Sequence, residues 1–210
     1  MHIADGVLPV SSLAVGWVGT VVVTGVTLRQ VPPEELPKAA VMTAGFFVAS
    51  LIHIPLGPTS VHLVLNGLVG IVLGWAAFAA ILVGLVLQAL LFQHGGLLTL
   101  GANALMMGIP ALAAYMIFGV RRFIKVRHPE AVAGFLAGAG AILLSGVILA
   151  LWLYSAGREF WPIARLALAA HLPLMVLEGL VCGAAAVFLI KVKPEILGGE
   201  THAHKENLVD

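Results

Sequence analysis

The chain has 210 residues, of which 60% are hydrophobic and 10% are charged, and its mean hydropathy is +1.07. A soluble domain carries about 25% charged residues, so this composition excludes a soluble protein and predicts one embedded in a membrane. The formal net charge of +1 gives no indication of nucleic-acid binding, and the single cysteine, Cys182, excludes a disulfide framework.

The N-terminus, with the sequence MHIADG, carries the first candidate site. It lacks the basic segment of a signal peptide, so we expect it to be retained. With a free amine on Met1, that amine, the backbone nitrogen of His2 and the His2 imidazole could bind one metal ion. Three coplanar nitrogens suit Ni(II), Cu(II) or some Co(II) complexes. Binding should weaken as pH falls, because the amide must lose its proton. The alternative is that His2 belongs to a frayed terminus.

The first predicted helix lies in the uncharged residues 6–28, a stretch long enough to cross a bilayer. Small residues recur in it at four-residue spacing, which places them in one stripe along the helix and lets another helix approach closely. The approaching helix could belong to this chain or to a partner membrane subunit, so the stripe is a candidate docking surface. Its members are Ser12, Gly16, Thr20 and Thr24.

Further membrane-spanning helices are predicted from the long uncharged stretches that follow. Residues 39–120 contain no Asp, Glu, Lys or Arg, and at about 20 residues per crossing they must hold several spans. One of these spans is short and could begin from a loop that dips into the protein. Turn residues and charged loops divide the chain after the first helix into spans at roughly 39–54, 60–74, 75–93, 99–120, 131–157 and 164–190.

We therefore predict an all-α, multi-pass membrane protein with seven transmembrane helices. Four basic residues lie between Arg121 and Arg127 with no acid before Glu130, which indicates a cytoplasmic loop by the positive-inside rule. Seven spans then place the N-terminus outside and the C-terminus in the cytoplasm. We expect one membrane-embedded domain over residues 1–193, a polar cytoplasmic tail over 194–210, and localisation in the cytoplasmic (inner) membrane.

This topology brings several polar residues to the outer face together with the N-terminus. His62 is a candidate fourth nitrogen donor, with a purely structural histidine as the open alternative. Ser60 and Asn103 could hydrogen-bond a ligating imidazole or an inserted N-terminal segment. Asp5 could do the same or could cap the helix that follows. His94 could approach the site through a loop hydrogen bond or as a ligand.

Ionisable and polar residues also fall inside predicted spans. His171 and Glu178 share one face of the last span, two helical turns apart. An intramembrane ionisable residue is a functional candidate by default, but this pair could instead tie helices together. Gln88 lies in mid-span, and we interpret it as an interhelical hydrogen-bonding residue.

Several segments of the chain together form a recognisable pattern: MHIADG, residues 57–63 with Asn66-Gly67-Leu68, 88–96, 100–103, and 171–175 with Glu178-Gly179. In these segments the chain resembles the CbiM/NikM family, the substrate-capture (S) components of cobalt and nickel energy-coupling factor transporters. One departure is Met106, where relatives often have Asn, so part of the polar surroundings differs here.

The resemblance implies seven helices and an N-terminal segment inserted into a pocket that opens to the outside. It implies that the transported substrate, Ni²⁺ or Co²⁺, is bound by the Met1 amine, the His2 amide and imidazole, and the His62 imidazole. It also implies a transmembrane coupling (T) subunit and two ATPase subunits as partners, with a small accessory membrane subunit as a further candidate. The absence of a GxxxxGK[ST] motif agrees with ATPases on other chains.

Two other functions stay open from the residues alone. A proton-coupled secondary metal transporter could use Glu178 as its relay. An intramembrane metal-dependent enzyme could use the core histidines, but the chain lacks an HExxH helix and paired intramembrane carboxylates. We expect a metal-capture component surrounded by membrane lipid, and not an enzyme. Four planar nitrogens favour Ni(II) over Co(II) on geometry.

Overall fold

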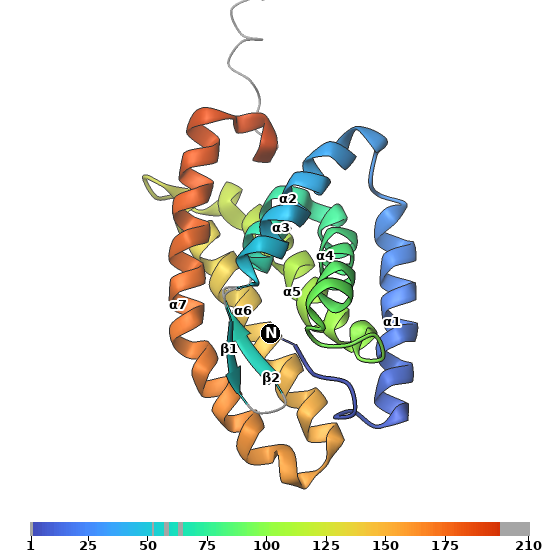
Figure 1. Ribbon diagram of the computed structural model, residues 1–210. Coiled ribbons are helices and arrows are strands. Elements are labelled where there is room, and N and C mark those ends of the chain that lie inside the picture. Colours follow the sequence, from blue (N-terminus) through green and yellow to red (C-terminus); the bar gives the residue numbers. More distant parts are fainter. Residues whose placement is uncertain (1, 52, 57–58, 63–64, 198–210) are drawn as a thin grey trace, which may run out of the picture.

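The computed structural model describes residues 2–51, 53–56, 59–62 and 65–197, the two short segments by their backbone alone (Figure 1). Over these residues the chain forms seven α-helices that run alternately up and down, and one β-hairpin. The helices are α1 (Val10–Leu28), α2 (Leu36–Ala49), α3 (Asn66–Leu73), α4 (Ala77–Phe92), α5 (Leu100–Gly119), α6 (Pro129–Ala156) and α7 (Trp161–Val192).

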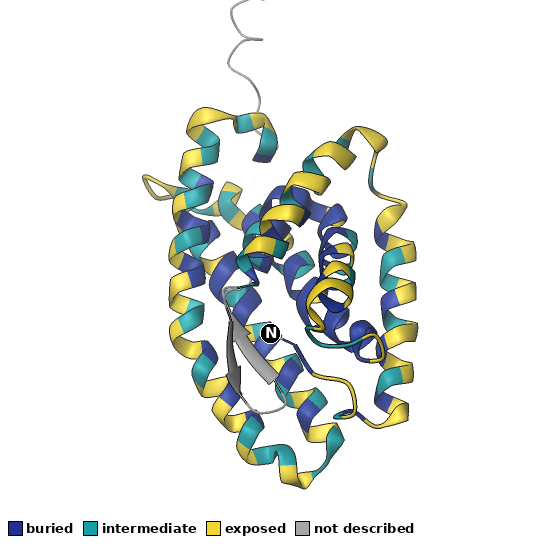
Figure 2. Ribbon diagram, in the orientation of Figure 1, coloured by how far each residue is buried: buried dark blue, intermediate teal, exposed yellow. Residues whose placement is uncertain are grey.

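Five helical segments within the described residues are long and apolar enough to cross a membrane. Their outward surface is apolar as well: Val15 and Val18 on α1 are 61% and 65% exposed, a distribution that suits lipid and not water. The buried positions gather on the helices at the centre of the bundle, α3 and α5 above all (Figure 2). The five segments cover residues 10–28, 66–92, 100–123, 129–156 and 158–192.

The region between α2 and α3 departs from the expected helix bounds, although the second of these spans was expected to be short and able to begin from a loop. The helix expected over 39–54 ends at Ala49, and the helix expected over 60–74 begins only at Asn66. Between them, β1 (His53–Leu56) pairs antiparallel with β2 (Thr59–His62), with His53 opposite His62. Proline provides the physical reason, because Pro55 removes a backbone donor and restricts the residue before it to extended conformations.

The segment over residues 66–92 reverses direction in its middle. Gly74 has φ +55°, a conformation that favours glycine, and a 3₁₀ turn, Gly74–Ala76, separates α3 from α4. α3 runs parallel to α5, since Asn66 donates to the Met107 carbonyl at 3.4 Å and Gly70 lies against Ala111. α4 runs antiparallel to α5. The chain therefore turns back at the glycine where the sequence predicted a break.

The small-residue stripe on α1 packs inside the protein. Gly16 lies so close to α5 that an added Cβ would be 2.7 Å from the Ala102 nitrogen. Thr20 donates to the Gly101 carbonyl at 2.8 Å, and Ser12 and Ser155 share a hydrogen bond of 3.0 Å. Thr24, further along the helix, is half-buried. Of the two alternatives for the stripe of Ser12, Gly16, Thr20 and Thr24, the structure supports packing within this chain over docking of a partner subunit, because α5 and α6 occupy most of it.

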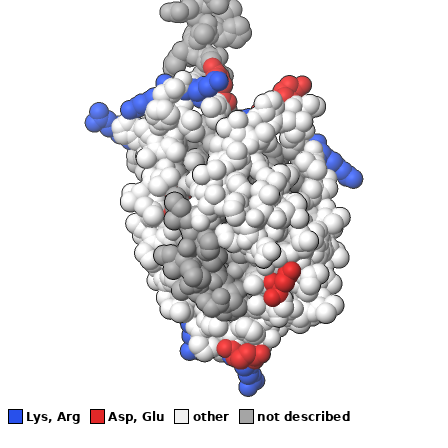
Figure 3. Space-filling view, viewed as in Figure 1, with Lys and Arg blue, Asp and Glu red and all other residues white. Residues whose placement is uncertain are grey.

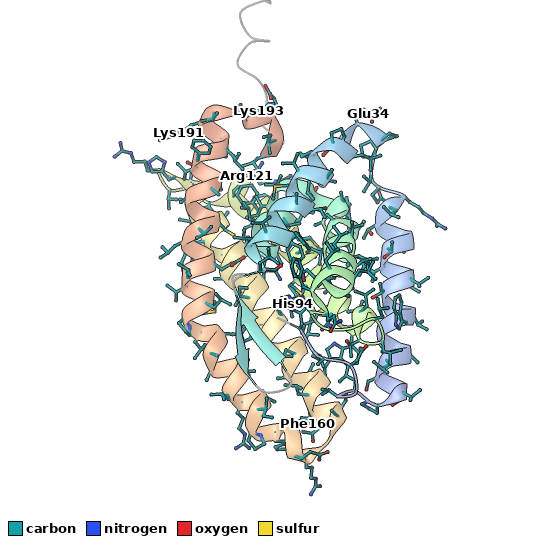
Figure 4. The ribbon with its side chains drawn as sticks, viewed as in Figure 1. Glu34, His94, Arg121, Phe160, Lys191 and Lys193 are labelled. Atoms are coloured by element: carbon teal, nitrogen blue, oxygen red, sulfur yellow. The ribbon has the colours of Figure 1, made fainter. Side chains whose placement is uncertain are left out.

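Charged side chains are concentrated at the two ends of the bundle (Figure 3). Eight of the ten Lys and Arg residues in the described part of the chain lie at the end where α1, α5 and α7 finish, and two lie at the opposite end. Figure 4 labels Arg121, Lys191 and Lys193 at the first end and Phe160 at the second. Basic charge thus distinguishes the two ends of the bundle.

The C-terminal segment returns to the bundle at the basic end. A 3₁₀ helix, Pro194–Leu197, follows α7, and Leu197 is buried. Arg121 donates from Nη2 to the Leu197 carbonyl at 2.7 Å. Residues 194–197, expected as the start of the polar tail, therefore pack against the bundle, and residues 198–210 lie outside the described part.

Packing of α1 on α5 gives a first prediction. Gly16→Ala should destabilise the protein by about 1–3 kcal/mol, because the new methyl group meets rigid backbone. Gly25→Ala on the same helix is the matched control, since nothing lies within 4 Å of its added Cβ. We expect it to be neutral or stabilising by up to about 1 kcal/mol. Denaturation in detergent micelles measures both changes, and equal stability of the two variants would contradict the close approach.

Candidate metal centre

The N-terminal segment runs from the start of α1 back into the helix bundle, so the N-terminal end of the chain lies near its centre (Figure 1). His2 is 6% exposed and Ile3 is fully buried. A buried backbone needs hydrogen-bond partners in place of water. The nearby helices must therefore supply donors and acceptors for an irregular segment.

Asn103 and Thr99, at the start of α5, satisfy the backbone of Ile3. The Ile3 N–H donates to Asn103 Oδ1 at 2.9 Å, and Asn103 Nδ2 donates to the Ile3 carbonyl at 3.1 Å. Thr99 Oγ1 lies 2.9 Å from the same carbonyl. Asn103 is buried and Thr99 fully so, so these bonds form without competition from water. Both backbone groups of one residue are thereby fixed to a helix terminus.

Asp5 fixes the segment to the loop between α4 and α5. Its N–H donates to the Gly95 carbonyl at 3.0 Å, and its Oδ1 accepts from the Thr99 N–H at 2.9 Å. Asp5 makes no cap for α1, whose N-cap residue is Pro9 with no side-chain hydrogen bond. Of the two roles left open for Asp5, the structure excludes the cap of the following helix, because its carboxylate accepts from the backbone N–H groups of Leu98 and Thr99, which precede α5.

Two glycines in this loop make room for the inserted segment. Gly95 and Gly96 have φ +82° and +136°, conformations that L side chains rarely adopt. An added Cβ at Gly96 would overlap the Asp5 carboxyl group, and one at Gly95 would lie 2.8 Å from Asn103 Nδ2 and 3.5 Å from His2 Cδ2. The loop backbone therefore lies directly against the segment.

The His2 imidazole contacts a polar side chain of α4, which in turn contacts one at the end of α2. Its Nε2 is 2.6 Å from Gln88 Oε1, and Gln88 Nε2 is 2.5 Å from Ser50 Oγ at the end of α2. The ring of His94 is 6.0 Å from the His2 ring, centroid to centroid, and Figure 4 labels it at the end of α4. The His94 N–H donates to the Gln88 carbonyl at 3.3 Å.

The structure thus brings His2, Asp5, His94 and Asn103 together. Met1 and the side chains of Ser60 and His62 lie outside the described residues, although the backbone places Ser60 and His62 on β2. Among the described residues, no group of three or more His, Cys, Asp and Glu side chains is placed to hold a metal ion.

Gln88 is the residue next to this centre that sequence reasoning missed, since it was expected only to connect helices. The available signal was a neutral amide in an uncharged stretch, six residues before His94. Its contact with His2 joins residues 86 positions apart.

The two ionisable residues of the last span are buried on α7. His171 is 2% exposed, and its Nδ1 lies 2.6 Å from the Ala167 carbonyl, one turn earlier. Since a carbonyl only accepts, this ring nitrogen carries the proton. Glu178 is fully buried, and its backbone carbonyl lies against Gly138 of α6. The close packing of α6 on α7 holds both residues inside the bundle.

Comparison with known proteins gives the family. Residues 2–196 match the model of the CbiM family, described as the cobalt uptake substrate-specific transmembrane region. The chain belongs to the CbiM family. A putative metal transport protein of Haemophilus influenzae is 36% identical over 202 residues, covering 94% of this chain and 97% of that protein. The fused nickel transport protein NikMN of Rhodobacter capsulatus is 32% identical, covering 90% of this chain and 59% of that longer protein.

A solved structure supports the same fold. The crystal structure of a transition metal transporter aligns with this CbiM-family chain over the full length of both, with a TM-score of 0.78 and 26% sequence identity. Family membership and the apolar helices together make the chain a multi-pass membrane protein.

The attachment of Ile3 gives a second prediction. Asn103→Ala removes two hydrogen bonds worth about 0.5–1.5 kcal/mol each, so the N-terminal segment of this CbiM-family protein should open more often. Hydrogen exchange at the Ile3 amide should accelerate by about 5–100-fold, while amides in the middle of α6 keep their rates. Unchanged exchange at Ile3 would show that Asn103 does not hold the segment.

Proposed function

We propose that this protein captures Ni²⁺ or Co²⁺ at the outer face of the cytoplasmic membrane and passes the ion to an ATP-driven importer. The observation that carries the proposal is the inserted N-terminal segment, with His2 buried and Ile3 held at both backbone groups. A frayed terminus would need no such attachments. An insertion of this kind positions the start of the chain as part of a binding site.

In the proposed site, the Met1 amine, the His2 amide nitrogen and His2 Nδ1 bind the metal. Amine and amide close a five-membered chelate ring, and amide and Nδ1 close a six-membered one. The His62 imidazole is the proposed fourth donor, from strand β2. Four planar nitrogens suit Ni(II) or Co(II) as the transported substrate. Because these nitrogens must lose protons to bind, affinity should rise with pH.

Polar neighbours support this site without contacting the metal. Asp5 and Asn103 hold the inserted segment, and His94 lies beside the His2 ring. Ser60 is proposed to orient the His62 imidazole. Groups of this kind fix ring orientation and tautomer in metal sites.

The charge distribution supports an orientation for the site. Most described Lys and Arg residues lie at the end where α1, α5 and α7 finish, and basic loops favour the cytoplasm. We propose that all seven helices contribute to the membrane domain of residues 1–193, with the N-terminus outside. The segment 194–210 is then cytoplasmic, and metal enters from the outer face.

The proposed partners are those that the family resemblance implies: a transmembrane coupling subunit, two ATPase subunits and a small accessory membrane subunit. Ion movement would depend on ATP hydrolysis in the ATPase subunits. The close match to a family described as a substrate-specific transmembrane region supports this division of labour. Cobalt in the family description and nickel in the name of one relative support both metals as substrates.

The chelate gives a third prediction. One glycine added before Met1 moves the terminal amine away from its position next to the His2 amide nitrogen. Ni²⁺ and Co²⁺ affinity should therefore fall by more than the roughly 10–100-fold loss caused by substitutions of residues that do not themselves bind the metal. A glycine added after Asp210 is the control and should leave affinity unchanged. Calorimetric titration of both variants, compared with the unaltered protein that starts at Met1, measures the difference. Equal affinities would eliminate the chelate.

The fourth donor gives a fourth prediction. His62→Ala should weaken metal binding as severely as the N-terminal extension, because it removes a ligand. His171→Ala is the matched control, since its Nδ1 already donates to the Ala167 carbonyl within α7, and it should retain most of the affinity. Titration with Ni²⁺ tests both. A loss for His171→Ala as large as for His62→Ala would move the metal to the core of the bundle.

A further inference from the structure

We propose that Gln88, oriented by Ser50, is a positioning residue that fixes the proton of the His2 imidazole on Nε2 and so presents Nδ1 to the metal. The inference rests on the proposed function, because it concerns the same chelate. It adds that a buried chain of hydrogen bonds from α2 and α4 prepares one tautomer of His2 before any metal arrives.

The donor and acceptor roles in this series of hydrogen bonds are set at Ser50, the member furthest from His2. Ser50 Oγ lies 2.7 Å from the Phe47 carbonyl. A carbonyl only accepts, so the Ser50 hydroxyl donates its one proton there. Towards Gln88, the same oxygen can then only accept. The 2.5 Å contact between Gln88 and Ser50 Oγ must therefore come from the amide NH₂ group of Gln88.

The orientation of the Gln88 amide follows. A flipped amide would place its oxygen against Ser50 Oγ, whose proton is already used. With the NH₂ group on Ser50, the amide oxygen Oε1 faces His2 Nε2 at 2.6 Å. An amide oxygen accepts, so Nε2 must carry the proton. A neutral imidazole with its proton on Nε2 has its lone pair on Nδ1.

The chelate requires that same tautomer. Nδ1 is bonded to Cγ, so a metal on the His2 amide nitrogen reaches it through a six-membered ring. Nε2 lies on the far side of the imidazole and would need a larger, strained ring. A His2 ring with its proton on Nδ1 would have to exchange tautomers before binding. Gln88 removes that step, and an acceptor on the distal N–H also makes the ligating nitrogen more basic.

The surroundings keep this arrangement rigid. Ser50 and Gln88 are fully buried and His2 is 6% exposed, so water does not compete for the bonds. Ser50 is the C-cap residue of α2. The Gln88 carbonyl accepts from Gln93, which has φ +56°, and from His94, and so ends α4. Two helix ends thereby fix both members of the pair.

The experiment is nitrogen NMR on protein carrying ¹⁵N-labelled histidine, without metal, in detergent micelles. The His2→Ala variant identifies the His2 signals. We expect the Nε2–H tautomer in the unaltered protein and a mixture in Gln88→Leu, which removes the acceptor. Gln88→Glu should retain the Nε2–H tautomer, because an oxygen remains to accept in either protonation state. Gln30→Leu, at an exposed position, is the control.

Metal affinity is then measured on the same proteins. Gln88→Leu should bind Ni²⁺ about 10–100-fold more weakly, whereas Gln88→Glu and Gln30→Leu should stay within a few-fold of the unaltered protein. Ser50→Ala is a second variant if Gln88→Leu fails to fold, since it frees the amide to flip. It should give a tautomer mixture and up to about tenfold weaker binding.

Three results would each overturn the inference. The first is an Nδ1–H tautomer of His2 in the unaltered protein, and the second is a tautomer that neither Gln88→Leu nor Ser50→Ala changes. The third is a changed tautomer with the same Ni²⁺ affinity as the unaltered protein. Failure of the chelate itself has a different signature, because the N-terminal glycine extension would then leave affinity unchanged. A tautomer set by Gln88 together with affinity lost in Gln88→Leu would support the proposal.

Discussion

The need to satisfy a buried, irregular backbone governs this structure. His2 and Ile3 are buried in the bundle, where water cannot provide hydrogen bonds, so α5 and the loop before it provide them instead. Asn103 and Thr99 bind Ile3, and Asp5 binds the loop in return. The two glycines of that loop lie at positive φ, and an added Cβ would collide with Asp5 of the segment at Gly96 and with Asn103 at Gly95. Removing one partner would leave buried polar groups unpaired, which costs about 1–3 kcal/mol each.

Close helix packing makes this arrangement possible. Gly16 of α1 and Gly101 of α5 allow backbone contact between the two helices, and this contact fixes the start of α5 just where Thr99 and Asn103 are needed. The same approach occupies the small-residue stripe of α1, so its opposite, apolar face is left towards lipid. The proposed capture site is therefore built on α5, with α2 and α4 contributing the polar groups around His2.

The sequence predicted the long elements well, because apolar runs longer than a bilayer leave few alternatives. The spans expected at 75–93 and 99–120 correspond closely to α4 and α5. It failed between Ala49 and Asn66, where short apolar segments do not distinguish helix from strand. Candidate residues near the site were found, with anchoring of the inserted segment among the roles considered for Asp5, but the contact between Gln88 and His2 was not. That contact joins residues 86 positions apart, and local patterns carry no information on such pairs.

The hydrogen bonds that hold Ile3 involve its main chain and not its side chain. Asn103 and Thr99 contact the N–H and C=O groups that every residue except proline offers. The Ile3 side chain is fully buried and therefore needs to be apolar, so valine or leucine should be tolerated there. The hydrogen bonds to Ile3 therefore fix the register of the segment by backbone position, so that the residue immediately before Ile3 is the one placed at the proposed metal site.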